Sequence, residues 1–198
     1  MYAIIQSPSE ILRTPAQPVD LPAGRQGLPI SKLKKIIEEM KQTLVAQDDP
    51  EGVGLAANQV NLPYRLFLAR LPLRSLGEGG PIHIFINPEI IAHSDQLQPK
   101  NKAAAEKAPL EGCLSLPKYY GLVKRWQWVK VRFQTIVNEN FKLKIENFEG
   151  FPATVIQHEM DHLDGKIFVE RIIEQNGKLY KSVGKNKKGK DIWDEVEI

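Results

Sequence analysis

Apolar residues recur at helical spacing in one segment near the N-terminus. The positions that share this face are Leu33, Ile36, Ile37, Met40 and Leu44. Such a stripe is typical of a helix that packs against a core. We expect the helix to run from Ser31 to about Gln47, because a serine hydroxyl can accept a hydrogen bond from a free amide of the first turn.

Four further segments have the apolar pattern of strands. Tyr64–Leu71 and Ile82–Ile91 are short apolar runs of strand length. Apolar and polar residues alternate over Val129–Val137 and again over Phe141–Ile145, with turn-forming residues between them. These last two segments therefore predict an antiparallel hairpin.

A second helix is predicted from about Pro152 to Leu163. Proline suits the first helical position, and Gly165 suits the position just past the end. The predicted strands come in runs and do not alternate regularly with helices. This order favours an α+β domain over a doubly wound one.

Proline, glycine and polar residues mark the segments outside these elements. The N-terminal arm is rich in proline and contains a predicted surface loop over Leu21–Pro29; Ala92–Pro109 reads as a second polar loop. The tail 178–198 is expected to form a hairpin, with the basic cluster Lys185–Lys190 at its tip. A solvated tip is the simpler interpretation of this cluster, and contact with RNA is the alternative.

Composition limits the class of protein. The 198 residues suffice for one domain, and we expect residues 1–198 to form a single domain. The net charge of +3 does not support nucleic-acid binding as the main activity. Cys113 is the one cysteine, which fits a reducing compartment. No secretion signal or membrane-spanning run is visible, so we expect a cytoplasmic protein without membrane partners.

The second predicted helix carries an H-E-x-x-H pattern, from His158 to His162. Residues four apart lie on one helix face, so two imidazoles there can bind one metal ion, and Glu159 can reach a water on that metal. The alternative is an ordinary helix with two surface histidines. His83, in a predicted strand, and His93, in a predicted loop, have no partner at such spacing.

A catalytic metal usually takes three protein ligands and leaves one position for water. Cys113 is the leading candidate for the third ligand, because the chain has only one thiol. A lone cysteine is otherwise often a small buried apolar residue. Gly112 before it and Pro117 after it indicate a turn-bounded segment.

The segment Gly52–Gln59 superficially fits a dinucleotide-binding pattern. We reject that interpretation, because acidic loop residues and not a buried strand precede it, and because no phosphate-binding lysine follows. A glycine turn that exposes backbone groups to an extended substrate is the better interpretation, with Gln59 as a side-chain donor. A purely structural turn at Gly52 and Gly54 remains an alternative.

Together, Gly52–Gln59, Glu111–Pro117 and Gln157–Gly165 resemble the three motifs that mark the peptide deformylase family. The likeness runs roughly from Ile4 to Ile173. It implies an α+β fold in which antiparallel sheets pack around a central helix that carries the metal ligands. It also implies metal-dependent removal of the formyl group from the N-terminal methionine of nascent polypeptides, with release of formate.

The resemblance assigns a role to each matching residue. Cys113, His158 and His162 match the metal ligands, Glu159 the acid/base, and the Gln59 side chain and Leu114 N–H the oxyanion donors. Residues that match the substrate groove and the methionine pocket are Val53, Gly54, Gly112, Leu114, Phe151, Thr154 and Val155. Arg125 is expected to pair with Glu111 and hold the cysteine segment. The family favours Fe²⁺, with Zn²⁺, Ni²⁺ or Co²⁺ as substitutes.

Some features depart from the family. Tyr120 stands where bacterial members often have arginine, and Leu21–Pro29 looks inserted. These departures leave substrate preference and ribosome contact open. Three other functions also stay open: a zinc protease that uses the same helix, a non-catalytic metal- or peptide-binding module, and a nucleic-acid-binding protein that uses the tail.

Overall fold

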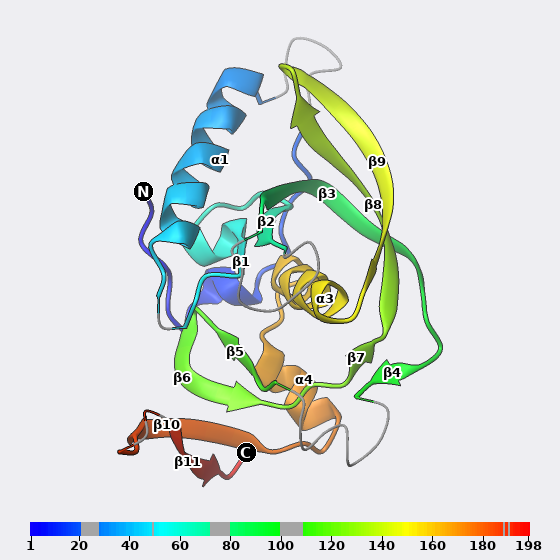
Figure 1. Ribbon diagram of the computed structural model, residues 1–198. Coiled ribbons are helices and arrows are strands. Elements are labelled where there is room, and N and C mark those ends of the chain that lie inside the picture. Colours follow the sequence, from blue (N-terminus) through cyan, green and yellow to red (C-terminus); the bar gives the residue numbers. More distant parts are fainter. Residues whose placement is uncertain (21–27, 49, 72–79, 100–108, 188, 190) are drawn as a thin grey trace.

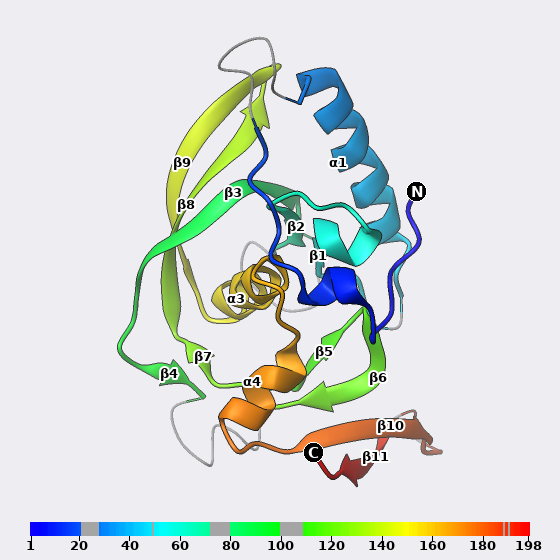
Figure 2. The same cartoon turned by 180° about the vertical axis from the view of Figure 1, so that it is seen from behind.

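The computed structural model describes residues 1–20, 28–48, 50–71, 80–99, 109–187, 189 and 191–198. In these ranges three α-helices and three antiparallel sheets form an α+β fold, which confirms the predicted class (Figure 1). The helix α3 (Phe151–Leu163) lies near the centre, with strands on more than one side of it, and Figure 2 shows the same arrangement from behind.

The largest sheet has five strands in the order β1-β2-β3-β8-β9. Its strands are β1 (Gly54–Ala56), β2 (Leu66–Arg70), β3 (Ile82–His93), β8 (Trp128–Val137) and β9 (Asn140–Glu149). The predicted hairpin is confirmed, because β8 and β9 pair antiparallel along their whole length. The strands predicted over Tyr64–Leu71 and Ile82–Ile91 correspond to β2 and β3.

Two helices cover opposite faces of this sheet. On one face, α1 (Ile30–Val45) packs its apolar stripe against Leu66 and Leu68 of β2. On the other face, α3 packs against Phe67 and Ala69 of the same strand. Neighbouring side chains of a strand point to opposite faces, so a strand covered on both sides is apolar throughout.

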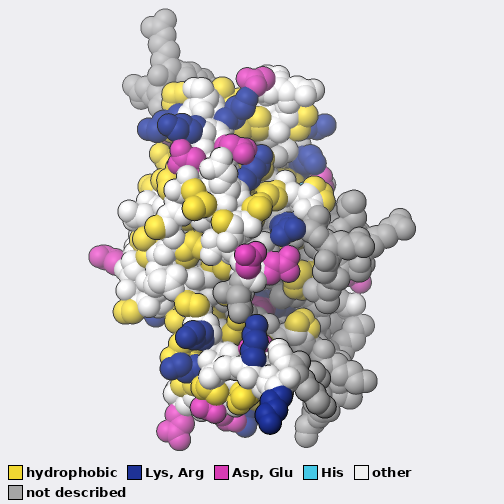
Figure 3. Space-filling view, turned by 60° about the vertical axis from the view of Figure 1, so that its left-hand side comes forward, with side chains coloured by type: hydrophobic (Ala, Val, Ile, Leu, Met, Phe, Trp, Pro, Cys, Tyr) yellow, Lys and Arg dark blue, Asp and Glu magenta, His cyan; other side chains and the backbone are white. Residues whose placement is uncertain are grey.

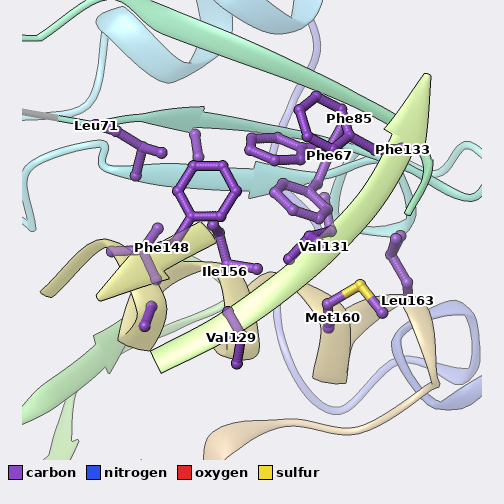
Figure 4. Packing of buried hydrophobic residues seen from close by; sticks show 14 of the residues in the cluster. Phe67, Leu71, Phe85, Val129, Val131, Phe133, Phe148, Ile156, Met160 and Leu163 are labelled. Atoms are coloured by element: carbon purple, nitrogen blue, oxygen red, sulfur yellow. The ribbon is translucent and has the colours of Figure 1, made fainter. Parts of the chain in front are cut away.

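The core around α3 is aromatic. Phe67, Phe85 and Phe133 come from three adjacent strands, and the ring centroids of Phe85 lie 4.4 Å from those of the other two (Figure 4). Ile156, Met160 and Leu163 of α3 are buried in the same cluster. This packing fixes the rotation of α3, and therefore which of its residues face away from the sheet.

A second sheet has the order β11-β10-β6-β5. Its strands are β5 (Glu111–Cys113), β6 (Leu116–Gly121), β10 (Leu179–Lys185) and β11 (Asp191–Val196). The predicted C-terminal hairpin is present, as β10 and β11, and it extends this sheet through β10–β6 pairing. The short helix α4 (Phe168–Glu174), which the sequence did not predict, buries Phe168 and Ile172 against it.

Some boundaries differ from the prediction. Ser31 is not the N-cap of α1: the helix begins at Ile30, and the Leu33 N–H donates to the Pro29 carbonyl and closes the first turn. His93 is not a loop residue: β3 extends to it because it pairs with Val129.

Part of the predicted loop 92–109 is ordered as a strand. β4 (Leu97–Gln98) pairs there with β7 (Arg125–Trp126). The His93 ring stacks on Trp126 at a centroid distance of 3.7 Å. Residues 100–108 of that loop and 21–27 of the other predicted loop lie outside the described residues, as do residues 188 and 190 of the basic cluster.

Charges are mixed over the visible surface. On the face in Figure 3, Lys and Arg side chains are interspersed with Asp and Glu, in keeping with the small net charge. Among the described residues, no helix is both long and apolar enough to cross a membrane.

Candidate active site

The helix α3 and the strand β5 bring three potential metal ligands together. His158 and His162 lie one turn apart on α3, with ring centroids 4.9 Å apart. Cys113, at the end of β5, places its Sγ 3.1 Å from His162 Nε2. One ligand atom from each of the three residues lies within 4.8 Å of the other two. A thiol and two imidazoles suit a divalent transition metal, so the donor set fits the implied ion.

His158 is held in one orientation by a buried ionic network. Its Nδ1–H donates to Glu111 Oε2 at 3.0 Å, which leaves Nε2 as the ligand atom. Arg125 donates to both oxygens of Glu111, at 2.8 and 2.9 Å, the pairing that the resemblance implies. Burial by itself would raise the pKa of Glu111, but the charges and hydrogen bonds of Arg125 and His158 together outweigh it and lower the pKa to about 2. Glu111 is therefore a permanent carboxylate that orients the imidazole.

The thiol of Cys113 is biased towards its ligand form. Burial favours the neutral thiol, but the charge on His162 and hydrogen bonds from both histidines outweigh it and lower the pKa to about 5. A thiolate is the form in which cysteine binds metals.

Glu159 is buried beside the ligands. Its side chain faces β1, where a Cβ added to Gly54 would lie 2.1 Å from Glu159 Oε1. Glu159 Oε2 is buried with no hydrogen-bond partner among the described residues. Burial raises the pKa of Glu159 to about 7, against the lowering effect of the two histidine charges. A carboxyl group with such a pKa is suited to accept and return a proton near neutral pH.

Gln59 presents its amide nitrogen to the same place. It lies in the 3-10 helix η2 (Ala57–Val60), and its Oε1 accepts a hydrogen bond from the Ala56 N–H at 2.8 Å. Its Nε2 therefore faces Ser115 Oγ, at 3.1 Å, and Cys113 Sγ, at 3.5 Å. The backbone contact fixes which end of the amide points to the ligands.

These groups open onto one cavity of about 440 Å³. The residues proposed from sequence that line it are Val53, Gly54, Gln59, Glu111, Gly112, Cys113, Leu114, Phe151, Thr154, Val155, His158 and Glu159. His162 and Arg125 do not line it: His162 is fully buried beneath the cavity, and Arg125 lies behind Glu111. The structure thus gathers every candidate residue at or directly behind one cavity.

Several contributing residues were missed by the sequence analysis. Asp161 receives hydrogen bonds from Arg125 and Arg171, which continues the network that begins at His158. Asn58 donates to the backbone carbonyl of His162 at 2.6 Å. Asp161 and Asn58 lie within the recognised motifs, and that position was their only signal in the sequence.

Comparisons with known proteins agree with this geometry. The protein-family model described as polypeptide deformylase matches residues 1–178 of this chain. A peptide deformylase of Afipia carboxidovorans is 38% identical over 84% of this chain and 84% of its own length. Peptide deformylase 1 of Bacillus subtilis is 36% identical over 85% of this chain and 88% of its own length.

Solved structures agree as well. The Met-Ala-Ser-bound crystal structure of a class I type b peptide deformylase from Acinetobacter baumannii matches with a TM-score of 0.69 and 30% identity. The match covers 87% of this chain and 98% of that one.

Proposed function

The chain belongs to the polypeptide deformylase family, and from this premise we propose how its own residues carry out the reaction. The family's reaction is metal-dependent hydrolysis of the formyl group on the N-terminal methionine of nascent polypeptides. One observation carries the assignment of roles: a thiol and two imidazoles converge within 4.8 Å, and the buried Glu159 adjoins them. We assign Cys113, His158 and His162 as the metal ligands.

The substrate binds as an extended strand between the two sheets. β1 and β5 are edge strands of their sheets, and residues of both line the cavity. Unpaired backbone groups on such edges can accept an added strand. Phe151, Thr154 and Val155 line the same cavity from α3, and we assign them to the pocket for the methionine side chain.

Glu159 moves the proton. Cys113, His158 and His162 would hold a divalent cation, and such an ion would supply Lewis acidity to the formyl carbonyl and to the attacking water. Glu159 accepts a proton from that water as the oxygen adds to the formyl carbon. It then returns the proton to the amine nitrogen as the carbon–nitrogen bond breaks, so formate and a free N-terminus are the products.

Two donors stabilise the oxyanion that forms on the formyl oxygen. We assign the Gln59 Nε2–H, which already faces the ligand cluster, and the backbone N–H of Leu114, which follows Cys113. Loss of one such donor typically costs roughly 2.7–4 kcal/mol of transition-state stabilisation. Glu111 and Arg125 act indirectly: Glu111 orients His158, and Arg125 holds Glu111.

We further propose that the native ion is Fe²⁺, with Zn²⁺, Ni²⁺ or Co²⁺ able to replace it. The soft thiolate beside two imidazoles supports this range of metals. Nascent formyl-methionyl peptides are the proposed partners and the cytoplasm the proposed location, since such chains emerge there. Contact of the C-terminal hairpin with the ribosome is a separate proposal, supported only by the lysines of that hairpin.

Two variants test the assigned roles. Cys113→Ala should lower the metal content of anaerobically purified protein to below about a tenth of an equivalent, since a three-ligand site loses its thiolate. Metal content would be measured by elemental analysis. Normal metal content in this variant would place the third ligand elsewhere.

Glu159→Gln should keep its metal but lose about 10²- to 10⁴-fold in kcat for formate release from formyl-Met-Ala-Ser, because the proton acceptor is gone. Near-normal turnover in this variant would remove Glu159 from the proposed role. The two variants together separate metal binding from proton transfer.

Family membership does not support the other functions left open by the sequence. A protease would act on an internal peptide bond, and a binding module would not turn over formyl peptides at all. The mixed surface charge does not favour a nucleic-acid-binding role. The formate-release assay distinguishes all three from a deformylase.

A further inference from the structure

The ring of Tyr120 covers the backbone of β5 beside the cavity. Tyr120 on β6 is paired directly with Gly112 on β5. A Cβ added to Gly112 would lie 2.5 Å from Tyr120 Cε1, so the ring occupies the space that a side chain at 112 would fill. Tyr120 also lines the cavity itself. The ring therefore leans towards the outer edge of β5, with which no strand of the described residues pairs.

The C-terminal hairpin continues this aromatic surface. Tyr120 is also paired with Tyr180 on β10, and Ser182, two residues further on, is paired with Trp193 on β11. Paired residues, and residues two apart on one strand, lie on the same face of a sheet. The rings of Tyr120 and Trp193 meet edge to face, with centroids 5.0 Å apart and planes at 75°.

This face is separate from the core of the second sheet. The core side holds Cys113 and Leu179, which pack with Phe168 and Ile172 of α4. Trp193 lies on the other side and is 39% exposed. The indole therefore leaves apolar area in water, next to a ring that lines the substrate cavity.

We propose that Tyr120 and Trp193 form an aromatic wall that extends the substrate groove and contacts the residues that follow the formylated methionine. The proposal rests on the proposed function, since it concerns the same groove. A strand added to the free edge of β5 places every second side chain on the face that carries Tyr120. The occupant is thus the nascent chain itself, because the wall is continuous with the cavity.

The wall favours apolar and aromatic side chains in the substrate and disfavours acidic ones. Aromatic pairs contribute about 0.5–1.5 kcal/mol beyond buried area, which corresponds to roughly 2- to 12-fold in an equilibrium constant. Among the described residues that line the cavity, Glu51, Glu111 and Glu159 carry carboxylates and none is lysine or arginine. Among the described residues of the cavity lining, a carboxylate that follows the methionine would find no lysine or arginine and would lie against the rings.

Two peptide series test this inference, formyl-Met-X-Ser and formyl-Met-Ala-X, with X as Phe, Ala or Asp. In the wild-type enzyme, Phe should exceed Asp by about 10-fold or more in kcat/KM at one of the two positions, chiefly through KM. Trp193→Ala should shrink that ratio about threefold or more. Tyr120→Arg should reverse it in favour of Asp, because a cation then replaces the ring.

Ile192→Ala is the matched control. Ile192 neighbours Trp193 on β11, is similarly exposed, and points to the opposite face of the sheet. This variant should keep the wild-type ratio. The inference is overturned if wild-type enzyme shows no preference at either position, or if the preference survives both Trp193→Ala and Tyr120→Arg. Failure to turn over formyl-Met-Ala-Ser would instead refute the proposed function.

Discussion

Gly54→Ala should disable the enzyme while leaving its metal site intact. The Cβ of the new side chain would lie 2.1 Å from Glu159 Oε1 and 2.6 Å from its Cδ. Real Cβ atoms essentially never come closer than 3.0 Å to such neighbours, so the carboxylate must move by about 1 Å. The three atoms nearest to the new Cβ all belong to Glu159, so we expect the ligands Cys113, His158 and His162 to keep their positions.

The size of the effect follows from the displacement. Moving a reacting group by about 1 Å can cost about 10²-fold in rate, which equals about 2.7 kcal/mol at 1.36 kcal/mol for each tenfold change. We therefore expect kcat for formate release from formyl-Met-Ala-Ser to fall by about two orders of magnitude. The metal content should stay at the wild-type level.

Two controls test whether the loss of activity comes from the displaced Glu159 carboxylate. Gly177→Ala adds the same methyl group where no atom of Glu159 is among its nearest neighbours; the nearest atom is Ile172 Cγ2 at 3.2 Å, and kcat should stay within about twofold of wild type. Glu159→Asp shortens the displaced side chain by one methylene. Because Gly54 and Glu159 are in contact, the double variant should lose far less than the two single losses combined.

A turnover of Gly54→Ala within about threefold of wild type would refute the reasoning. It would mean that Glu159 does not need its present position, and hence that it is not the group that transfers the proton. A loss of metal in the same variant would also refute the reasoning, since only the Glu159 carboxylate should be displaced.

Two predictions concern stability. Arg125→Met should lower the free energy of unfolding by about 3–5 kcal/mol in urea titrations, because it leaves the buried carboxylates of Glu111 and Asp161 without their shared cation. An unchanged midpoint of the unfolding transition would show that water already solvates these carboxylates. Phe85→Ala should cost about 3–5 kcal/mol in the same titration, because the fully buried ring stacks on Phe67 and packs at a tilt against Phe133. A loss below about 1 kcal/mol would mean that the core closes around the space left by the ring.

The elements that the sequence predicted are those whose signal is local. The stripe of α1, the alternation of β8 and β9, and the terminal residues of α3 each lie within one short segment. The strand β5 and the helix α4 have no comparable signal. β5 has three residues and α4 has seven, and each exists because it packs against the other parts of its sheet. Local spacing cannot report such dependence on distant partners.

The residues of the site also divide into those with a local signal in the sequence and those that depend on distant partners. Motif spacing located the potential ligands and Glu159, since His158, Glu159 and His162 share one helix. It did not reveal the ionic network behind them, because Asp161 joins Arg125, which lies 36 residues away, and Arg171, which lies on another helix. The contact between Tyr120 and Trp193 likewise depends on how β10 pairs with β6. These contacts depend on how distant segments pair in the fold, and the sequence of a single segment does not determine that pairing.

The two glycines of the first motif illustrate what the structure adds. Sequence alone left open whether they serve a turn or the site, and neither has a positive φ that would demand glycine. A Cβ at Gly52 would lie 2.1 Å from the Leu44 carbonyl oxygen, so this glycine is needed for packing against the end of α1. Gly54 is needed for a different reason, because Glu159 occupies the space above it. Two positions of one motif, separated by a single residue, therefore serve stability and chemistry respectively, and only the position of α3 distinguishes them.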